Sequence, residues 1–202
     1  MTNGKKSQLM QLIKQKGIVV PNYDITLSSG EKSNYYYDLR RIALDPKGLD
    51  LLGGLLFEEV SKKYDARSVG GLEAGAIPIS ASIVMKSSGG HKDEISGFYV
   101  RKQPKLHGLQ KKIEGYLIEP IVIVDDVLTK GSSVMQALEA VMNEGFNVAG
   151  VVCVIDREDK TPNYLIQNNI KYSSLFKHSD FKSFIDEEIK KKQKLKTQSL
   201  FL

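Results

Sequence analysis

The chain has 202 residues, of which 41% are hydrophobic and 26% are charged, and its net charge is +5. These values are typical of a single soluble globular domain, and the mild positive excess suits anionic small molecules such as phosphates. The sequence has neither a continuous basic helix nor a zinc-ligand spacing, so we do not expect it to bind nucleic acid.

The chain contains one cysteine, Cys153, within the apolar run VVCVI. A single cysteine permits no disulfide within one chain, and we expect a buried core thiol. The N-terminus lacks the long apolar segment of a signal peptide, and no apolar run reaches the ~20 residues that span a bilayer. We therefore expect a cytoplasmic protein that does not enter a membrane.

The first predicted elements form a distinct N-terminal piece. Residues 7–16, SQLMQLIKQK, place apolar side chains on one helical face, and Gly17 is a stop signal. Residues 17–44 are rich in β-formers interrupted by SSGEKS, which predicts a strand, a turn and a second strand. Within a single domain, residues 1–45 are expected to form this piece and residues 46–202 the core.

From residue 46 onward, apolar strands alternate with helices. Strands are predicted at 68–72, 95–102, 121–126, 147–158 and 171–176. Helices are predicted at 46–64, 78–88, 132–145, 161–169 and 179–192. Residues 102–115 are polar and basic, and we expect a loop there. Because continuous apolar strands alternating with helices indicate βαβ crossovers, the expected fold class is α/β, with a five-stranded, mostly parallel sheet flanked by helices.

The stretch IVIVDDVLTKGSSV, residues 121–134, carries the clearest chemical signal. Asp125 and Asp126 stand at the carboxyl end of a predicted strand, where ligands of parallel sheets bind. Carboxylates accept hydrogen bonds from hydroxyls, while residues 129–133 offer backbone amides, hydroxyls and a helix N-terminus to an anion. Neither a Walker nor a GxGxxG pattern is present. The pattern indicates a ribose 5-phosphate site, although two acids at a strand end are also compatible with a simple turn.

This stretch resembles the phosphoribosyl pyrophosphate (PRPP)-binding motif of type I phosphoribosyltransferases. The resemblance implies that the two acids hold the ribose hydroxyls and that the following loop holds the 5-phosphate. The residues that the motif would contribute are Asp125, Asp126, Val127, Leu128, Thr129, Lys130, Gly131, Ser132 and Ser133. Lys130 is a departure, because this loop more often carries a small residue or threonine there.

The stretch FYVRKQPKLHG, residues 98–108, resembles the catalytic loop of orotate phosphoribosyltransferases. Alone, it is equally compatible with an exposed basic loop. The resemblance implies that Arg101, Lys102, Lys105 and His107 stabilise the charge of departing pyrophosphate. It also implies a homodimer, because the loop of this family reaches into the active site of the neighbouring subunit.

The stretch TLSSGEKSNYYYDLR, residues 26–40, resembles the N-terminal hood of the same family. The resemblance implies that the backbone at Tyr36 and Tyr37 contacts orotate. Ser28 is a departure, because some family members carry a substrate-contacting lysine there. Lys32 is the substitute cation that we suggest.

The stretch VVCVIDRED, residues 151–159, places Arg157 just after a predicted strand. The planar guanidinium group matches a carboxylate in two hydrogen bonds, and the resemblance implies that it binds the carboxylate of orotate. Thr129 is expected to contact the base as well. Without the resemblance, the position of Arg157 fits an ordinary surface arginine better than a ligand-binding one.

The stretch GGLEAGAIPIS, residues 70–80, resembles the pyrophosphate loop of the family. Glu73, Ala74 and Gly75 form its centre, and we expect a strained or cis peptide between Glu73 and Ala74. Gly75 stands where some relatives carry a lysine, so backbone amides are expected to contribute more of the binding here.

Taken together, these stretches identify the chain as a member of the orotate phosphoribosyltransferase family, with the type I phosphoribosyltransferase fold. The resemblance implies transfer of ribose 5-phosphate from PRPP to orotate in pyrimidine (UMP) biosynthesis. Mg²⁺ is the expected cofactor, bound through the substrates with no direct ligand from the protein. Two alternatives stay open. The first is a non-catalytic regulator that binds PRPP and recruits nucleic acid, and the second is a phosphoribosyltransferase for another base.

Overall fold

The computed structural model describes residues 2–26, 32–88, 94–103, 112–158 and 163–199. A six-stranded sheet runs through its centre in the order β10-β9-β8-β5-β6-β7. Its strands are β5 (Ser68–Leu72), β6 (Ser96–Val100), β7 (Ile113–Gly115), β8 (Ile121–Leu128), β9 (Val148–Asp156) and β10 (Lys171–Lys177). Five of these strands run parallel, which confirms the predicted fold class.

The sixth strand, β7, corrects the prediction that residues 102–115 form only a loop. It pairs antiparallel with β6, with Val100 opposite Ile113 and Phe98 opposite Gly115. A three-residue strand at the edge of a sheet has one neighbour and little room for an apolar pattern. For that reason the sequence did not reveal it.

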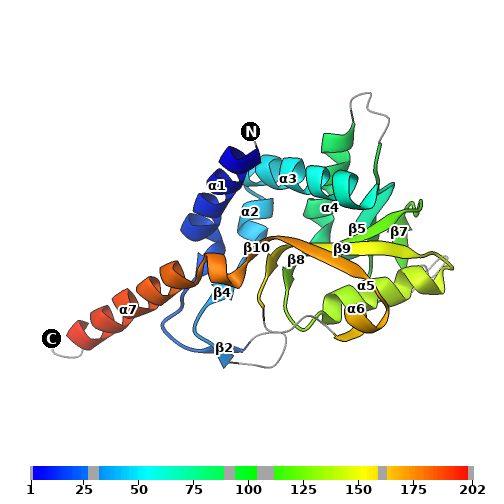
Figure 1. Ribbon diagram of the computed structural model, residues 1–202. Helices are drawn as coiled ribbons and strands as arrows, with labels where there is room; N and C mark the ends of the chain where they lie inside the picture. Colours follow the sequence, from blue (N-terminus) through cyan, green and yellow to red (C-terminus); the bar gives the residue numbers. More distant parts are fainter. Residues whose placement is uncertain (1, 27–31, 89–93, 104–111, 159–162, 200–202) are drawn as a thin grey trace.

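Helices cover both faces of the sheet (Figure 1). The helices after the N-terminal piece are α3 (Pro46–Tyr64), α4 (Ala76–Ser87), α5 (Ser132–Asn143), α6 (Asn163–Gln167) and α7 (Lys182–Ser199), with a 3-10 turn, η2 (His178–Asp180), before α7. Helices α3 and α4 lie on one face, whereas α5 and α6 lie on the other. Helix α4 begins two residues before Pro78, the residue at which we expected it to open.

The side chains of β8 alternate between two hydrophobic clusters. Val122 and Val124 pack in the cluster on the α3–α4 face, while Ile121 and Ile123 pack in the cluster on the α5 face. This alternation follows from the two-residue period of a strand, and both faces are apolar because helices cover both. Cys153 lies in the second cluster and is 1% exposed, which confirms the expected buried thiol.

The N-terminal piece shares its core with the sheet. It consists of α1 (Thr2–Leu12), a π-helical turn η1 (Ile13–Gly17), the antiparallel pairs β1 (Ile18–Val19) with β4 (Tyr36–Tyr37) and β2 (Ile25–Thr26) with β3 (Lys32–Ser33), and α2 (Arg40–Ala43). A helix followed by strands was predicted, but the structure has four short strands in two antiparallel pairs where the sequence indicated two strands joined by a turn. Leu9, Ile13 and Ile42 belong to the same buried cluster as Leu52 and Leu56 of α3.

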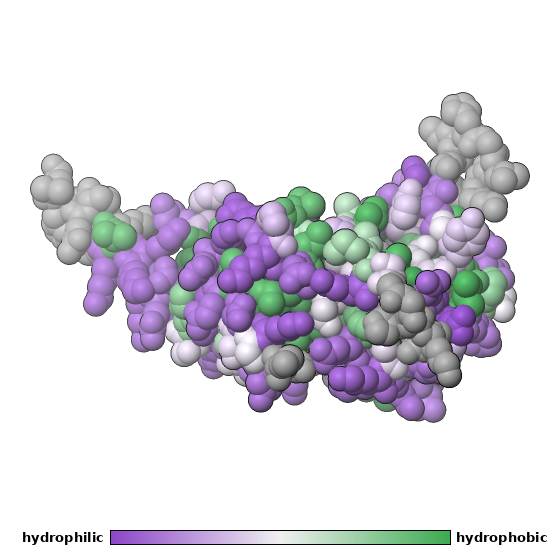
Figure 2. Space-filling view, turned by 90° about the horizontal axis from the view of Figure 1, so that it is seen from above, coloured by the Kyte–Doolittle hydropathy of each residue, from purple (hydrophilic) through white to green (hydrophobic). Residues whose placement is uncertain are grey.

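Helix α7 projects from the body of the molecule, and hydrophilic residues dominate it in the space-filling view (Figures 1 and 2). The Lys192 ammonium contacts the carbonyl oxygen of Val20, which ties α7 to the N-terminal piece. Hydrophobic residues appear elsewhere on that face in scattered positions. None of the helices within the described ranges combines the length and the apolar character needed to span a bilayer.

Candidate active site

The acid pair lies inside β8, whose end at Leu128 is two residues beyond the predicted one. The amide of Asp126 donates to Asp125 Oδ1 at 3.0 Å, and the amide of Val127 donates to Asp126 Oδ1 at 2.8 Å. Asp125 is only 9% exposed, and its burial, with the neighbouring charge of Asp126, raises its pKa well above the usual carboxyl range. The pair therefore favours a ligand that brings hydroxyl donors or a cation.

A cavity opens at the carboxyl edge of the sheet, directly over this acid pair. Its lining residues are Tyr36, Tyr37, Asp125, Asp126, Val127, Thr129, Gly131, Ser132, Ser133 and Arg157. The structure thus brings together most of the residues that the sequence assigned to ribose, phosphate and orotate. Leu128 is buried in the core and Lys130 is exposed, and neither lines the cavity.

The phosphate side of the cavity is the N-terminus of α5. Gly131, with φ of +78°, occupies the N-cap position, and Ser132 and Ser133 begin the helix at the predicted residue. Glycine is suited to that position because it adopts positive φ without steric cost. The first amides of a helix have no partner within it, and together with the serine hydroxyls they form an anion site.

Arg157 is held on the cavity wall by the N-terminal piece. Its Nη2 donates to the Tyr35 hydroxyl at 2.7 Å, and its guanidinium carbon lies 4.9 Å from the centre of the Tyr35 ring. The other contacts of Tyr35 include His178, whose ring stacks on it at 5.4 Å between centroids. His178 Nδ1 and the Tyr37 hydroxyl share a 2.9 Å hydrogen bond, and burial raises the pKa of Tyr37.

Sequence reasoning missed Tyr35 and His178 as parts of this site. The resemblance pointed to Tyr36 and Tyr37 and not to their neighbour Tyr35. His178 follows the carboxyl end of β10 at the same edge of the sheet as Asp125, and that position was the signal available in the sequence.

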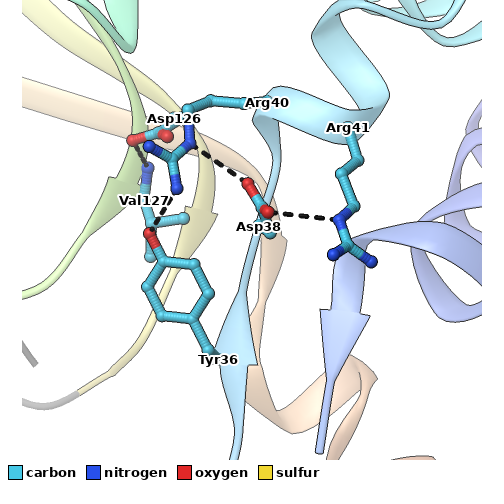
Figure 3. A network of polar contacts seen from close by, with 6 residues as sticks. All are labelled: Tyr36, Asp38, Arg40, Arg41, Asp126 and Val127. Atoms are coloured by element: carbon cyan, nitrogen blue, oxygen red, sulfur yellow. Dashed lines mark hydrogen bonds and ion pairs between the residues drawn. The ribbon is translucent and has the colours of Figure 1, made fainter. Parts of the chain in front are cut away.

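A network of polar contacts lies between α2 and the acid pair (Figure 3). Arg40 donates from Nε to Asp38 at 3.1 Å and from Nη2 to the Tyr36 hydroxyl at 3.3 Å. Arg41 binds the other oxygen of Asp38 at 3.2 Å. In the close-up, the Arg40 side chain extends toward Tyr36 and Asp126, while Arg41 lies on the opposite side of Asp38.

The expected pyrophosphate turn borders the same acid pair. The peptide between Glu73 and Ala74 is cis, as the sequence suggested. A Cβ atom on Gly75 would lie 3.3 Å from the Asp126 carboxylate, so a side chain there would crowd it. The amide of Glu73 donates to the Val100 carbonyl at 2.9 Å, which fixes the turn against β6.

The described part of the predicted catalytic loop starts beside this turn. The amide of Lys102 donates to Glu73 Oε1 at 2.9 Å, and its side chain is exposed. Arg101 Nη1 lies 3.8 Å from the Glu114 carboxylate on β7. Lys105 and His107 fall outside the described residues, and so does Ser28.

Lys32 lies in β3, is exposed, and is not among the residues that line the cavity. Among the described residues, no group of three or more His, Cys, Asp or Glu side chains converges as a metal site.

Comparison with known proteins identifies the family, although no family model matches the chain. A curated orotate phosphoribosyltransferase of Aquifex aeolicus is 38% identical over 179 residues, which is 87% of this chain and 97% of that protein. One from Rhodopirellula baltica is 39% identical over 165 residues, covering 78% and 85% of the two chains. This chain belongs to the orotate phosphoribosyltransferase family. The family predicted from the motifs is therefore confirmed, and with it the class of enzyme, a pentosyltransferase.

Solved structures of the orotate phosphoribosyltransferase family agree with this assignment. The Mycobacterium tuberculosis enzyme in complex with Fe(III) dicitrate superposes with a TM-score of 0.73 at 33% identity, covering 87% of this chain and 98% of that one. The same enzyme in complex with PRPP gives a TM-score of 0.70 at 31% identity, covering 87% and 98%. The predicted type I phosphoribosyltransferase fold is confirmed.

Proposed function

We propose that this chain transfers ribose 5-phosphate from PRPP to orotate, giving orotidine 5′-phosphate and pyrophosphate in UMP synthesis. The observation that carries the proposal is the single cavity in which the acid pair, the Gly131–Ser133 anion site and Arg157 meet. In the reaction, a ring nitrogen of orotate bonds to the anomeric carbon as the bond from that carbon to the diphosphate breaks.

Each part of the cavity has a role in this proposal. Asp125 and Asp126 accept hydrogen bonds from the ribose hydroxyls, and the start of α5 binds the 5-phosphate. Arg157 pairs with the carboxylate of orotate, while Thr129 and the backbone at Tyr36 and Tyr37 orient the base. Holding both reactants in line supplies much of the rate enhancement, because little acid–base chemistry is required.

The leaving diphosphate needs positive charge, because negative charge collects on it as the bond breaks. We assign this role to Lys102, whose backbone amide is hydrogen-bonded to Glu73 of the Glu73–Gly75 turn, and to the adjacent Arg101. Lys105 and His107 complete the assignment on the basis of the motif alone. The turn itself contributes backbone amides beside Asp126.

Mg²⁺ is the proposed cofactor. This ion prefers oxygen ligands, keeps several waters and binds through one or two carboxylates together with substrate phosphates. The cavity fits a metal held in this way, because its acid pair and anion site would hold the ribose and phosphate groups of PRPP, and the ion would bind through the oxygens of PRPP with no direct ligand from the protein. When bound, the ion would neutralise charge on the diphosphate.

The homodimer with shared catalytic loops and the cytoplasmic location are likewise proposals, which rest on the motif resemblance and on the sequence. Sedimentation of the purified chain tests the dimer, and cell fractionation tests the location.

The deciding experiment measures pyrophosphate release from PRPP and Mg²⁺ with a panel of bases. We expect release with orotate and none with uracil or a purine, which lack the carboxylate that Arg157 would bind. Turnover with another base in place of orotate would favour the alternative transferase. Tight PRPP binding without turnover on any base would favour the regulator.

A further inference from the structure

Arg40 stands where α2 begins, next to the acid pair but outside every role assigned so far. Its hydrogen bonds to Asp38 and Tyr36 fix the guanidinium group, and Tyr36 lines the cavity. In Figure 3 the side chain leaves α2 and extends toward Asp126. The side chain is 57% exposed, so the guanidinium edge that these contacts do not use is accessible to a ligand.

Three elements meet at Asp126. They are the Arg40 side chain from the N-terminal piece, the carboxylate at the end of β8, and the turn at Gly75, where an added Cβ would lie 3.3 Å from that carboxylate. The hydrogen bond to Asp38, followed by the charges of Tyr36, Asp38 and Asp126, raises the pKa of Arg40. Arg40 is therefore a permanent positive charge beside the acid pair.

The chemistry of the proposed substrate calls for such a charge. A diphosphate placed between Asp126 and the Gly75 turn brings several negative charges next to two carboxylates, and like charges at that distance repel. Among the described residues that line the cavity, Arg157 is the cationic one. Its contacts with Tyr35 hold it at the wall that we assign to orotate, so it is not placed to bind the diphosphate. Lys32, which we suggested from the sequence, is not part of this arrangement.

We propose that Arg40 binds the diphosphate group of PRPP, and of the product pyrophosphate, from the N-terminal side of the cavity. This inference rests on the proposed function of the same cavity. Arg40 supplies a planar pair of N–H donors to phosphate oxygens, a geometry that lysine does not reproduce. The contact adds positive charge at the place where the bond to the diphosphate breaks.

Arg41 provides a matched control. It is the next residue of α2, it pairs with the same Asp38 at 3.2 Å, and its side chain is 60% exposed compared with 57% for Arg40. Its side chain lies on the opposite side of Asp38 from the acid pair (Figure 3). Substitution of either arginine removes one surface charge and one contact to Asp38. Arg40→Gln also removes the hydrogen bond to the Tyr36 hydroxyl, so the KM for orotate is measured alongside to detect any disturbance of Tyr36.

The experiment compares Arg40→Gln with Arg41→Gln in steady-state kinetics, varying PRPP and orotate separately, and measures inhibition by pyrophosphate. We expect the KM for PRPP and the inhibition constant of pyrophosphate to rise about tenfold in Arg40→Gln, which is about 1.4 kcal/mol of lost binding. The KM for orotate should stay within about twofold, and Arg41→Gln should match wild type. Equal PRPP and pyrophosphate constants in the two variants would overturn the inference.

Two further results keep the outcome decisive. If Arg40→Gln does not fold, Arg40→Lys decides, because lysine keeps the charge and loses the two-donor geometry. A rise of about threefold or more in the KM for PRPP then supports the contact, and an unchanged KM rejects it. Wild-type protein that releases no pyrophosphate with orotate would reject the proposed function itself, whereas wild-type turnover with an unaffected Arg40 variant rejects only the role of Arg40.

Discussion

The contact between Tyr35 and Arg157 sets up a quantitative test of the orotate site. Tyr35→Phe removes the 2.7 Å hydrogen bond to Nη2 and leaves the ring beneath the guanidinium group. A hydrogen bond to a charged group contributes roughly 1.5–3 kcal/mol, and partial exposure lowers this to about 1 kcal/mol here. Because 1.4 kcal/mol corresponds to a factor of ten, the KM for orotate should rise about fivefold.

Tyr35→Ala should cost more, because it also removes the ring on which the guanidinium group rests. A cation–π contact adds roughly 0.5–2 kcal/mol, which brings the total to about 2 kcal/mol and the rise in KM to about thirtyfold. The assay is pyrophosphate release with orotate titrated at saturating PRPP. Tyr23→Phe is the control, since Tyr23 is 72% exposed and lies outside the cavity lining.

The two Tyr35 variants separate positioning of Arg157 from general damage to the site. If both variants keep the wild-type KM for orotate, Tyr35 does not position Arg157 and the reasoning is wrong. If the KM for PRPP rises as much as that for orotate, the substitutions have disturbed the whole cavity.

Three further predictions concern the acid pair, the tight packing of the sheet, and the loop. Burial raises the pKa of Asp125, so the free-energy cost of its charge in the folded state grows as the pH rises above ~3.9. Asp125→Asn should therefore melt higher at pH 7, by about 2–4 °C per kcal/mol recovered, while losing turnover. Equal melting temperatures at pH 7 in calorimetry, or a difference that persists below about pH 4, would contradict this. Gly71→Ala places a Cβ 2.1 Å from the Val124 carbonyl oxygen and should lower the free energy of unfolding by about 3 kcal/mol. Gly145→Ala should cost only about 1 kcal/mol, because Gly145 has φ of +84° but open space around it. Similar denaturation midpoints for the two variants would refute the packing argument. Lys102→Ala should lower turnover roughly 10²-fold, and mixing it with Asp125→Ala should restore activity if subunits share loops; no recovery on mixing would argue against shared sites.

The acid pair and its loop could be predicted because their signal is local. An apolar strand, two carboxylates and a Gly–Ser loop are contiguous in the chain, and parallel sheets bind ligands at that edge. Helix α5 begins at the predicted residue, Ser132, but its N-cap is Gly131, whose positive φ is set by the turn and not by the general preference for serine at an N-cap.

Contacts between distant segments could not be predicted in the same way. Tyr35 and Arg157 are 122 positions apart, and Tyr37 and His178 are 141 apart. Nothing in the sequence near either partner specifies the other, since the contact exists only after the N-terminal piece has packed on the sheet. The same holds for Arg40, whose place beside Asp126 depends on how α2 meets β8.

The buried cluster shared by the N-terminal piece and α3 limits how freely the two can be exchanged. Leu9, Ile13 and Ile42 share one buried cluster with Leu52 and Leu56 of α3. The N-terminal piece therefore cannot be exchanged between relatives simply by joining two sequences at residue 45. A chimera made in that way would place side chains of unmatched shape in the shared cluster and would displace α2 and β4. Tyr36 and Tyr37 of β4, which line the cavity, would move with them. A change of substrate preference made through the N-terminal piece therefore requires matching changes in the buried cluster.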